Sequence, residues 1–497
     1  MQNNSLEDWQ LKASRLDFDG RLFIRGSRVE AGNRSVLTKV NPATGNEFAE
    51  LVIGDIEDID YAVKAAREAF DDSDWNRGGA EYRKPRILKL AELLEDASDQ
   101  MALFDSLEIG KPVRESATID APGSAALFRF YAEAIDKVED TVPVTPVGST
   151  AIVSRQALGV VGVIVPWNYP LEILTWKLAP ALATGNTVVV KPSTESSFSA
   201  LKLADLAKEA GVPDGVINIV PGAGRDVGEA LARHEDVDMV AFTGSTAVAK
   251  RLQVCAGQSN LKRLALEAGG KSANIIFADS LNLKTAAEKA AFGAFYNQGE
   301  VCSANSRIFV EESVIDEFLT YFAESAKSYS PGNPLDPESG TGSLVSKRHA
   351  DKVWDAVQEA IRSGEKVFGG DRLQIENSDA FIAPTAVRDV PLDHELHKVE
   401  VFGPLALVNS FTDEAQVIEA ANGTDFGLAA SVWTNDFAKA NRVAAKLVAG
   451  TVSVNTVDAL GFTTPFGGFK QSGFGRDLSL YALENYTDLK TTWHQWG

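Results

Sequence analysis

The chain has 497 residues, of which 44% are hydrophobic and 24% are charged. These proportions are typical of a globular protein, and the length predicts two or three domains because one hydrophobic core rarely grows so large. The formal net charge of −21 argues against nucleic acid and anionic membranes as main partners, since both would repel it.

The two cysteines, Cys255 and Cys302, are too few for a disulfide framework and suit a reducing compartment. Residues 1–10 are polar and acidic, without the basic flank and apolar core of a signal peptide. The longest apolar run, 160–167, is too short to cross a bilayer. We therefore expect a cytoplasmic protein that does not bind membranes.

The first part of the chain predicts a small strand-bearing region followed by helices. Residues 22–24 have the character of a strand, and residues 41–45 form a turn rich in proline and glycine. Helical periodicity extends from 59 to 131. Residues 138–157 are punctuated by proline and glycine, and we expect them to form an extended arm outside their own domain.

A regular alternation of apolar strands and helices begins at Val160. The expected strands cover 160–165, 187–190, 216–220 and 239–242, and the expected helices cover 171–184, 199–210, 227–233 and 247–256. Apolar strands joined by helices indicate a parallel, doubly wound sheet. Such sheets bind ligands beyond the carboxyl ends of their strands.

The turns that follow these strands favour a dinucleotide site. Turns 221–224 and 243–246 contain glycine and open helices, so their backbone N–H groups are free to bind phosphate, and Lys191 adds a cation. The glycine spacing after Pro221 misses the G-x-G-x-x-G fingerprint by one residue, and an ordinary tight turn is the alternative.

A second alternating unit begins with a strand at 274–277, a helix at 283–294, a strand at 306–310 and a helix at 313–325. Cys302 follows a turn that contains glycine, and Glu267 precedes a Gly-Gly turn. A thiol and a separately placed carboxylate are the minimum for covalent acyl chemistry followed by hydrolysis. The alternative, a buried structural cysteine and a glutamate at a helix end, is favoured by these two patches alone.

Seven short blocks extend the pattern over nearly the whole chain: 166–168, 191–193, 242–246, 266–271, 297–302, 400–404 and 465–470. In this order they resemble the aldehyde dehydrogenase superfamily. Residues 8–10, 131–137 and 475–493 are most similar to its bacterial branch of gamma-glutamyl-gamma-aminobutyraldehyde and 4-guanidinobutyraldehyde dehydrogenases.

The resemblance implies an α/β fold with a doubly wound, NAD(P)-binding domain (1–137 and 158–266), an α/β catalytic domain (267–470) and a β oligomerisation arm (138–157 and 471–497). It also implies a homotetramer built as a dimer of dimers. The reaction implied is oxidation of an aldehyde to its carboxylic acid. The rivals are an inactive member with a structural or binding role and a nicotinamide-independent esterase.

By resemblance, Cys302 attacks the aldehyde to form a thiohemiacetal, Asn168 and the Cys302 backbone N–H stabilise its oxyanion, and Glu267 activates water against the thioester. A base at this position argues for hydrolysis over transfer to coenzyme A. The cofactor-binding residues implied are Ile164, Trp167, Lys191, Ser193, Thr194, Gly224, Ser245, Val248, Glu400 and Phe402.

The cofactor implied by the resemblance is NAD or NADP. Relatives that prefer NAD usually have glutamate three positions after the lysine, whereas this chain has Thr194 there and Glu195 one step later. Threonine does not repel a 2′-phosphate, so NADP is acceptable unless Glu195 turns in and restores the preference for NAD.

The implied substrate channel combines aromatic and acidic residues: Tyr169, Glu172, Ile173, Trp176, Val301, Ser303, Val457, Asp458 and Phe466. Glu172 and Asp458 would attract an amino-, guanidino- or gamma-glutamylamino-butyraldehyde, unless they are solvated charges at the channel mouth. The aromatic residues leave room for an arylacetaldehyde or aliphatic aldehyde.

Two further features are set aside. Cys255 falls in an amphipathic helical run and is expected in a core. The segment 394–397 contains two histidines, but their spacing differs from the zinc-binding H-E-x-x-H pattern, so no metal is expected.

Overall fold

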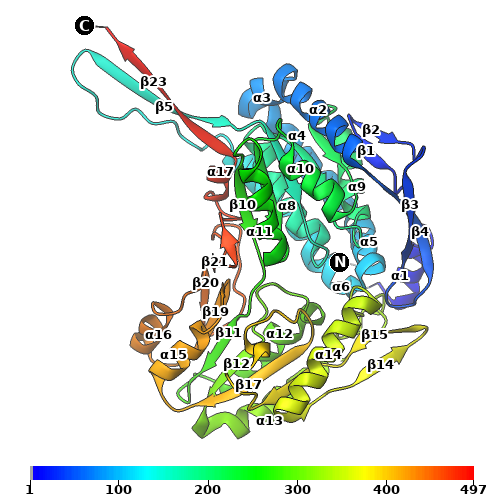
Figure 1. The fold of residues 1–497 in the computed structure, drawn as a ribbon, viewed down its shortest axis with the longest axis vertical. Coiled ribbons are helices and arrows are strands. Elements are labelled where there is room, and N and C mark those ends of the chain that lie inside the picture. Colours follow the sequence, from blue (N-terminus) through cyan, green and yellow to red (C-terminus); the bar gives the residue numbers. More distant parts are fainter. Residues whose placement is uncertain (1–3, 497) are drawn as a thin grey trace.

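The computed structural model describes residues 4–496, which form two lobes and a projecting hairpin (Figure 1). The first lobe contains an eight-stranded sheet of order β2-β1-β8-β7-β6-β9-β10-β22, and the second contains a seven-stranded sheet of order β13-β16-β17-β12-β11-β19-β20. None of the helices within residues 4–496 combines the length and apolar character needed to span a membrane.

The first sheet contains the strands expected from the alternating pattern. Its members are β1 (Leu22–Ile24), β2 (Ser27–Val29), β6 (Val160–Ile164), β7 (Thr187–Lys191), β8 (Ile217–Ile219), β9 (Met239–Thr243), β10 (Arg263–Glu267) and β22 (Gly473–Phe474). The strands β6 to β10 pair in parallel, which confirms the doubly wound sheet. Glu267 ends a strand, so the alternative of a glutamate at a helix end is wrong.

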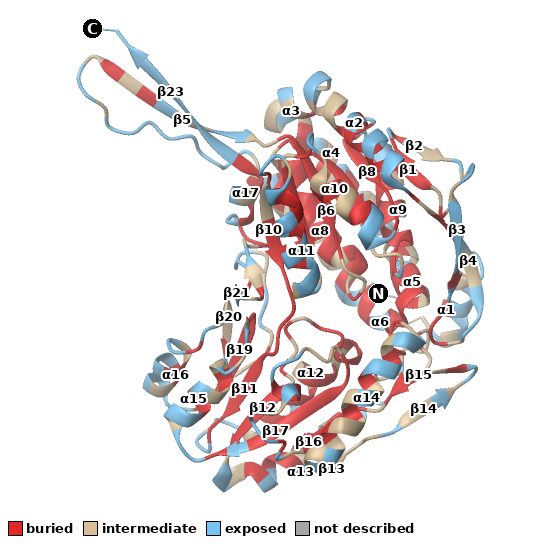
Figure 2. Ribbon diagram, viewed as in Figure 1, coloured by how far each residue is buried: buried red, intermediate tan, exposed pale blue. Residues whose placement is uncertain are grey.

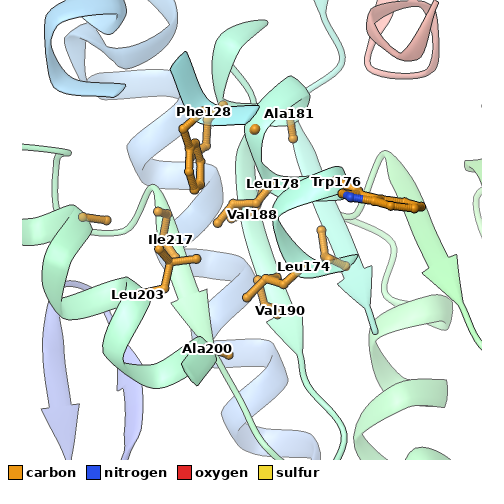
Figure 3. Packing of buried hydrophobic residues seen from close by; sticks show 14 of the residues in the cluster. Phe128, Leu174, Trp176, Leu178, Ala181, Val188, Val190, Ala200, Leu203 and Ile217 are labelled. Atoms are coloured by element: carbon orange, nitrogen blue, oxygen red, sulfur yellow. The ribbon is translucent and has the colours of Figure 1, made fainter. Parts of the chain in front are cut away.

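Helices cover both faces of this sheet, which explains why its central strands are apolar throughout. Val188 and Val190 face the cluster formed with α8 (Pro170–Ala183) and α9 (Phe198–Glu209) (Figure 3). Val189 belongs to the opposite cluster, with α2 (Ile56–Asp72). The helices of this lobe are α1 (Leu6–Ala13), α2 (Ile56–Asp72), α3 (Asp74–Arg77), α4 (Gly79–Asp96), α5 (Ser98–Ile109), α6 (Val113–Glu115), α7 (Ala121–Ala134), α8 (Pro170–Ala183), α9 (Phe198–Glu209), α10 (Glu229–Arg233), α11 (Thr246–Gly257) and α17 (Ala482–Asn485). The expected helix at 227–233 begins earlier, because a π-helical turn at Gly224–Gly228 leads into α10.

The second sheet is parallel except for its edge strand β13. Its strands are β11 (Ala273–Ile276), β12 (Arg307–Glu311), β13 (Glu365–Phe368), β16 (Thr385–Arg388), β17 (Leu405–Phe411), β19 (Ala429–Trp433) and β20 (Thr451–Val454). Its helices are α12 (Leu283–Phe295), α13 (Ile315–Ala326), α14 (Lys347–Ser363), α15 (Glu414–Asn422) and α16 (Phe437–Ala444). Small two-stranded sheets join β3 (Ser35–Val40) to β4 (Glu47–Ile53), β14 (Arg372–Ile375) to β15 (Ser378–Ile382), and β18 (Phe426–Gly427) to β21 (Phe469–Lys470).

The projecting hairpin pairs β5 (Ser149–Ala157) with β23 (Thr487–Gln495) in antiparallel register. Most of its residues are exposed (Figure 2), in contrast to the buried strands of both lobes. The C-terminal segment assigned to the arm divides in the structure. Residues 473–474 extend the first sheet beside β10, and α17 packs near α8, so only the part from Thr487 onward enters the hairpin.

Candidate active site

A cavity of about 800 Å³ is lined by residues of both lobes. It brings together the three residues for which the sequence predicts catalytic roles: Asn168 after β6, Glu267 at the end of β10, and Cys302 after α12. These residues are far apart in sequence and meet because the carboxyl end of the first sheet faces the turn that carries Cys302.

A strained turn leads from α12 to Cys302. Asn297 and Gln298 have φ values of 47° and 56°, and Gly299 follows at 70°, so three consecutive residues adopt the left-handed conformation. Such a conformation costs free energy for residues other than glycine. Hydrogen bonds hold it: Asn297 Nδ2 donates to the carbonyl of Asn168 at 3.1 Å, and Gln298 Oε1 accepts from the N–H of Gly342 at 3.2 Å.

The amide of Asn168 is oriented by the same turn. Its Nδ2 donates to the carbonyl oxygen of Glu300 at 2.9 Å, and the side chain is buried. One N–H is thereby used, and the second remains available to the cavity. The backbone N–H of Cys302 has no acceptor among residues 4–496. Two neutral donors are therefore free near the thiol, as an oxyanion site requires.

Glu267 is buried, and its Oε1 has no hydrogen-bond partner within the described chain. Burial raises the pKa of this carboxyl well above its ordinary value, and the negative charge of Asp477 adds to the shift, while Lys177 and Arg476 oppose it. The carboxylate occupies space that glycine leaves open, since a Cβ at Gly467 would lie 2.7 Å from Oε1.

Cys302 is half-buried at the cavity wall. Burial raises the pKa of its thiol, with further contributions from the charges of Asp458, Glu267 and Glu400, and a backbone hydrogen bond from Ser303 opposes them. The resting site thus favours the neutral thiol of Cys302 over its thiolate. Two changes would favour the thiolate. A base could remove the thiol proton, and a positive charge could bind beside the sulfur.

The residues expected to bind the adenosine half of the cofactor lie at the carboxyl ends of β6 to β9 and outside the cavity lining, except for Ser245. Lys191 ends β7 and is only 8% exposed, and burial lowers its pKa to about 8. Its ammonium has no hydrogen-bond partner within residues 4–496. An ammonium that has no partner, at the end of a buried lysine side chain, suits the hydroxyl groups of a ribose, so the residues present fit NAD(P).

The other expected adenosine-side residues surround this point. Ile164 is the last residue of β6, Gly224 opens the π-helical turn, and Ser245 caps α11 by accepting the Val248 N–H at 3.4 Å. Ser193 and Thr194 lie in the turn after β7. A Cβ at Gly224 would meet nothing within 4 Å, which leaves open space in front of the turn.

The residues expected on the nicotinamide side of the cofactor line the cavity itself. The Trp167 ring packs edge-on against Phe402, with centroids 5.3 Å apart. Glu400 accepts the Gly270 N–H at 3.1 Å, and burial raises its pKa to about 7. Close packing explains the neighbouring glycine, since a Cβ at Gly269 would lie 2.1 Å from the Glu400 carboxylate.

The expected channel residues lie along the same cavity. They are Tyr169, Glu172, Ile173, Trp176, Val301, Ser303, Asp458 and Phe466, whereas Val457 packs in the core of the second lobe. Trp176 and Phe466 pack edge-to-face at 5.2 Å. Burial raises the pKa of Glu172 to about 8, and the charges of Asp120 and Asp458 reinforce this while Lys111 opposes it.

One face of Tyr169 already carries a cation. Lys111 Nζ lies 3.8 Å from the ring centroid and pairs at 2.5 Å with Asp120, both fully buried. The cation–π contact with Lys111 fixes the position of the Tyr169 ring, next to Asn168 in the sequence. No motif or periodicity in the sequence indicates this pair.

Other cavity residues were also missed: Ile119, Gly123, Phe292, Tyr296, His349, Leu460 and Phe462. Phe292 and Tyr296 are four positions apart and lie just before the 297–302 block, and their rings pack together. Their place beside that block could have predicted that they line the site. His349 is distant in sequence from all seven of the short blocks. Its Nε2 contacts the Phe402 carbonyl at 2.7 Å, and its ring packs against Trp167, so these contacts fix its position at the cavity.

The features that were set aside occupy other places. Cys255 is buried in the apolar cluster beneath α11. His397 Nε2 contacts the Val390 carbonyl at 3.1 Å, and no group of three or more potential metal ligands occurs within residues 4–496.

The chain is similar over nearly its whole length to known aldehyde dehydrogenases. The aldehyde dehydrogenase family model matches residues 29–492. The chain is 46% identical over 493 residues to the NADP/NAD-dependent aldehyde dehydrogenase PuuC of Escherichia coli K12, covering 99% of each protein. The solved indole-3-acetaldehyde dehydrogenase AldA of P. syringae, in complex with NAD⁺ and IAA, superposes with a TM-score of 0.98 at 43% identity, covering 99% of this chain and 100% of that one. The gamma-glutamyl-gamma-aminobutyraldehyde dehydrogenase of Burkholderia cenocepacia superposes with a TM-score of 0.97 at 43% identity and the same coverage.

Proposed function

Because the chain belongs to the aldehyde dehydrogenase family, we propose that it oxidises an aldehyde bearing a cationic group to the carboxylic acid, with Cys302 as nucleophile. NAD or NADP, when bound, accepts the hydride that leaves the aldehyde carbon. The residues that would hold it are Lys191, Ser193 and Thr194 on the adenosine side and Glu400 and Phe402 on the nicotinamide side.

The chain's own residues supply the covalent and acid-base steps. The Cys302 thiol loses its proton to solvent, and the thiolate forms a bond to the aldehyde carbon as the carbonyl π bond opens to an oxyanion. The free N–H of Asn168 and the Cys302 backbone N–H stabilise that oxyanion. Glu267 takes a proton from the water that hydrolyses the resulting thioester and releases the acid. Its unsatisfied Oε1 is the acceptor available for that proton.

The proposed substrate class rests on the two carboxyl groups of the channel. Glu172 and Asp458 both line the cavity, and neither forms an ion pair within the described residues. Lys111 forms its ion pair with Asp120, so its charge only partly offsets that of Glu172. Both side chains are half-buried and receive hydrogen bonds from Trp176 and Ser303 but no cation, so an ammonium or guanidinium at the far end of the substrate would pair with them. An amino-, guanidino- or gamma-glutamylamino-butyraldehyde fits this requirement.

An arylacetaldehyde or aliphatic aldehyde is the second candidate. Trp176 and Phe466 form an aromatic wall, and the similar AldA structure is that of an indole-3-acetaldehyde dehydrogenase. Protonated, Glu172 and Asp458 would then be neutral parts of the wall.

The two candidates are separated by kcat/KM for 4-aminobutanal, 4-guanidinobutanal, phenylacetaldehyde and hexanal, measured with NAD and with NADP. We expect the cationic aldehydes to be preferred by wild type and to lose that preference in Glu172→Gln and Asp458→Asn, while hexanal is turned over as before. A wild-type preference for phenylacetaldehyde that both variants retain would favour the second candidate.

We also propose that the protein is a cytoplasmic homotetramer assembled through the hairpin of β5 and β23. Val144 and Val147, which lead into β5, are fully exposed, and Trp493 and Leu489 of β23 are mostly exposed. Such apolar side chains on a projecting arm are stabilised by contact with another subunit. Sedimentation of wild type and of Val147→Asp/Trp493→Ala tests this: the variant should dissociate, and a monomeric wild type would contradict the proposal.

A further inference from the structure

A buried ion pair lies beneath the turn that follows β7. Lys39 is the single buried residue of β3, whose other residues are all exposed, and Glu108 lies near the end of α5. The Lys39 Nζ and Glu108 Oε1 atoms are 3.1 Å apart, and the two side chains are 4% and 0% exposed. The otherwise exposed strand β3 thus contributes one charged side chain to the interior of the first lobe.

Both members of the pair bind the backbone of the turn. Lys39 Nζ donates to the carbonyl oxygens of Thr194 at 2.6 Å and Glu195 at 2.7 Å. The Glu108 carboxylate accepts the N–H groups of Ser197 at 3.0 Å and Phe198 at 2.9 Å, where α9 begins. These backbone groups lie outside the strand and helix ladders, so the pair supplies partners that regular structure does not.

Stability alone does not explain this arrangement. Burying a lysine and a glutamate costs desolvation free energy that a pair of apolar residues of similar size would avoid. An apolar pair, however, would leave four backbone groups of one turn without these partners. The ion pair therefore provides what an apolar pair could not, a fixed backbone conformation between Ser193 and Phe198.

We propose that Lys39 and Glu108 are positioning residues that fix this turn for the adenosine ribose of NAD(P). The inference rests on the proposed function, in which Ser193 and Thr194 contact that ribose. Holding the Glu195 backbone also keeps its side chain near Lys191, on which the Glu195 charge acts. A carboxylate there disfavours a 2′-phosphate, so the pair also affects the choice between NAD and NADP.

The test compares Lys39→Met with Arg83→Met. Arg83 is a matched control because it is also buried and donates to backbone carbonyls, those of Ala183 at 3.0 Å and Trp75 at 2.9 Å, away from the turn. For Lys39→Met we expect about tenfold weaker NADH binding by fluorescence titration, because charge-assisted hydrogen bonds that order the turn are lost. We also expect a higher KM for NAD, a smaller difference between NAD and NADP, and a kcat close to wild type.

Wild-type NADH affinity and an unchanged NAD to NADP ratio in folded Lys39→Met would overturn the proposal, and so would an equal loss in Arg83→Met. If Lys39→Met does not fold, Glu108→Gln provides the test instead, because this substitution leaves Lys39 without its charge partner. Wild-type NADH affinity in Glu108→Gln would also overturn the proposal. Failure of wild type to oxidise any aldehyde would contradict the proposed function instead, and NADH titration would still report on the turn.

Discussion

The Asn168 side-chain amide donates a 2.9 Å hydrogen bond to the carbonyl of Glu300, two residues before Cys302. In return, the Asn168 carbonyl accepts a hydrogen bond from Asn297 at 3.1 Å. These bonds tie the loop after β6 to the left-handed turn of the second lobe. The position of the proposed oxyanion donor and that of the nucleophile are therefore set by one another.

Asn168→Ala should lower kcat by about 10²–10³, which is the usual cost of losing one oxyanion donor. KM for the aldehyde should change little, because the donor acts most strongly on the developing charge. Steady-state kinetics at saturating cofactor provide the measurement. Asn168→Asp should do no better than alanine, since a carboxylate cannot donate to the Glu300 carbonyl. A kcat within twofold of wild type in both variants would contradict the assignment.

Glu267→Gln should separate the two halves of the reaction. Thioester formation does not need this base, whereas hydrolysis does, so a rapid burst of reduced nicotinamide should be followed by a much slower steady state. In wild type, the hydrolytic rate should rise with pH, because burial keeps Glu267 neutral until the pH passes its raised pKa. Stopped-flow absorbance over a pH series measures both effects. Loss of the burst itself would assign Glu267 to the earlier step.

Selectivity for a cationic aldehyde should increase with pH. Burial raises the pKa of Glu172 to about 8, so the carboxyl becomes negatively charged as the pH rises from 7 to 9. A guanidinium stays charged throughout this range. The ratio of kcat/KM for 4-guanidinobutanal to that for hexanal should therefore rise in wild type and stay flat in Glu172→Gln. A flat wild-type ratio would show that Glu172 does not contact the cation.

The cofactor preference should respond to charge in the turn after β7. Thr194→Glu adds a carboxylate where NADP carries its 2′-phosphate, and kcat/KM for NADP should fall about tenfold while that for NAD is retained. Glu195→Gln should have the opposite effect on NADP. Kinetics with both cofactors give the answer, and equal changes for NAD and NADP would place these side chains away from the ribose.

Much of the first sheet could be predicted because its strands are recognisable from short stretches of sequence. Apolar strands such as β6 and β7, covered on both faces, produce continuous runs of valine that sequence periodicity detects. The expected site residues Asn168, Lys191 and Glu267 likewise lie at or just after strand ends. Their roles were implied by the resemblance of short blocks, whereas composition and spacing alone favoured a structural cysteine.

The buried ion pair of Lys39 and Glu108 could not be predicted, because it joins elements that are distant in sequence. Lys39 lies on a strand that is otherwise exposed, and nothing nearby indicates that it reaches Glu108 and the turn at Thr194. The destination of residues 473–486 was missed for a similar reason. The short strand β22 has two residues, and only its pairing with β10 reveals that it extends the first sheet.

The central claim is that Cys302 forms the covalent intermediate, and Cys255 offers an internal control because it is buried in an apolar cluster. The most direct test is reduction of NAD or NADP by purified Cys302→Ala and Cys255→Ala over the aldehyde panel. The account predicts that Cys302→Ala yields neither a burst nor turnover, while Cys255→Ala retains wild-type kcat. Turnover that persists in Cys302→Ala would contradict it.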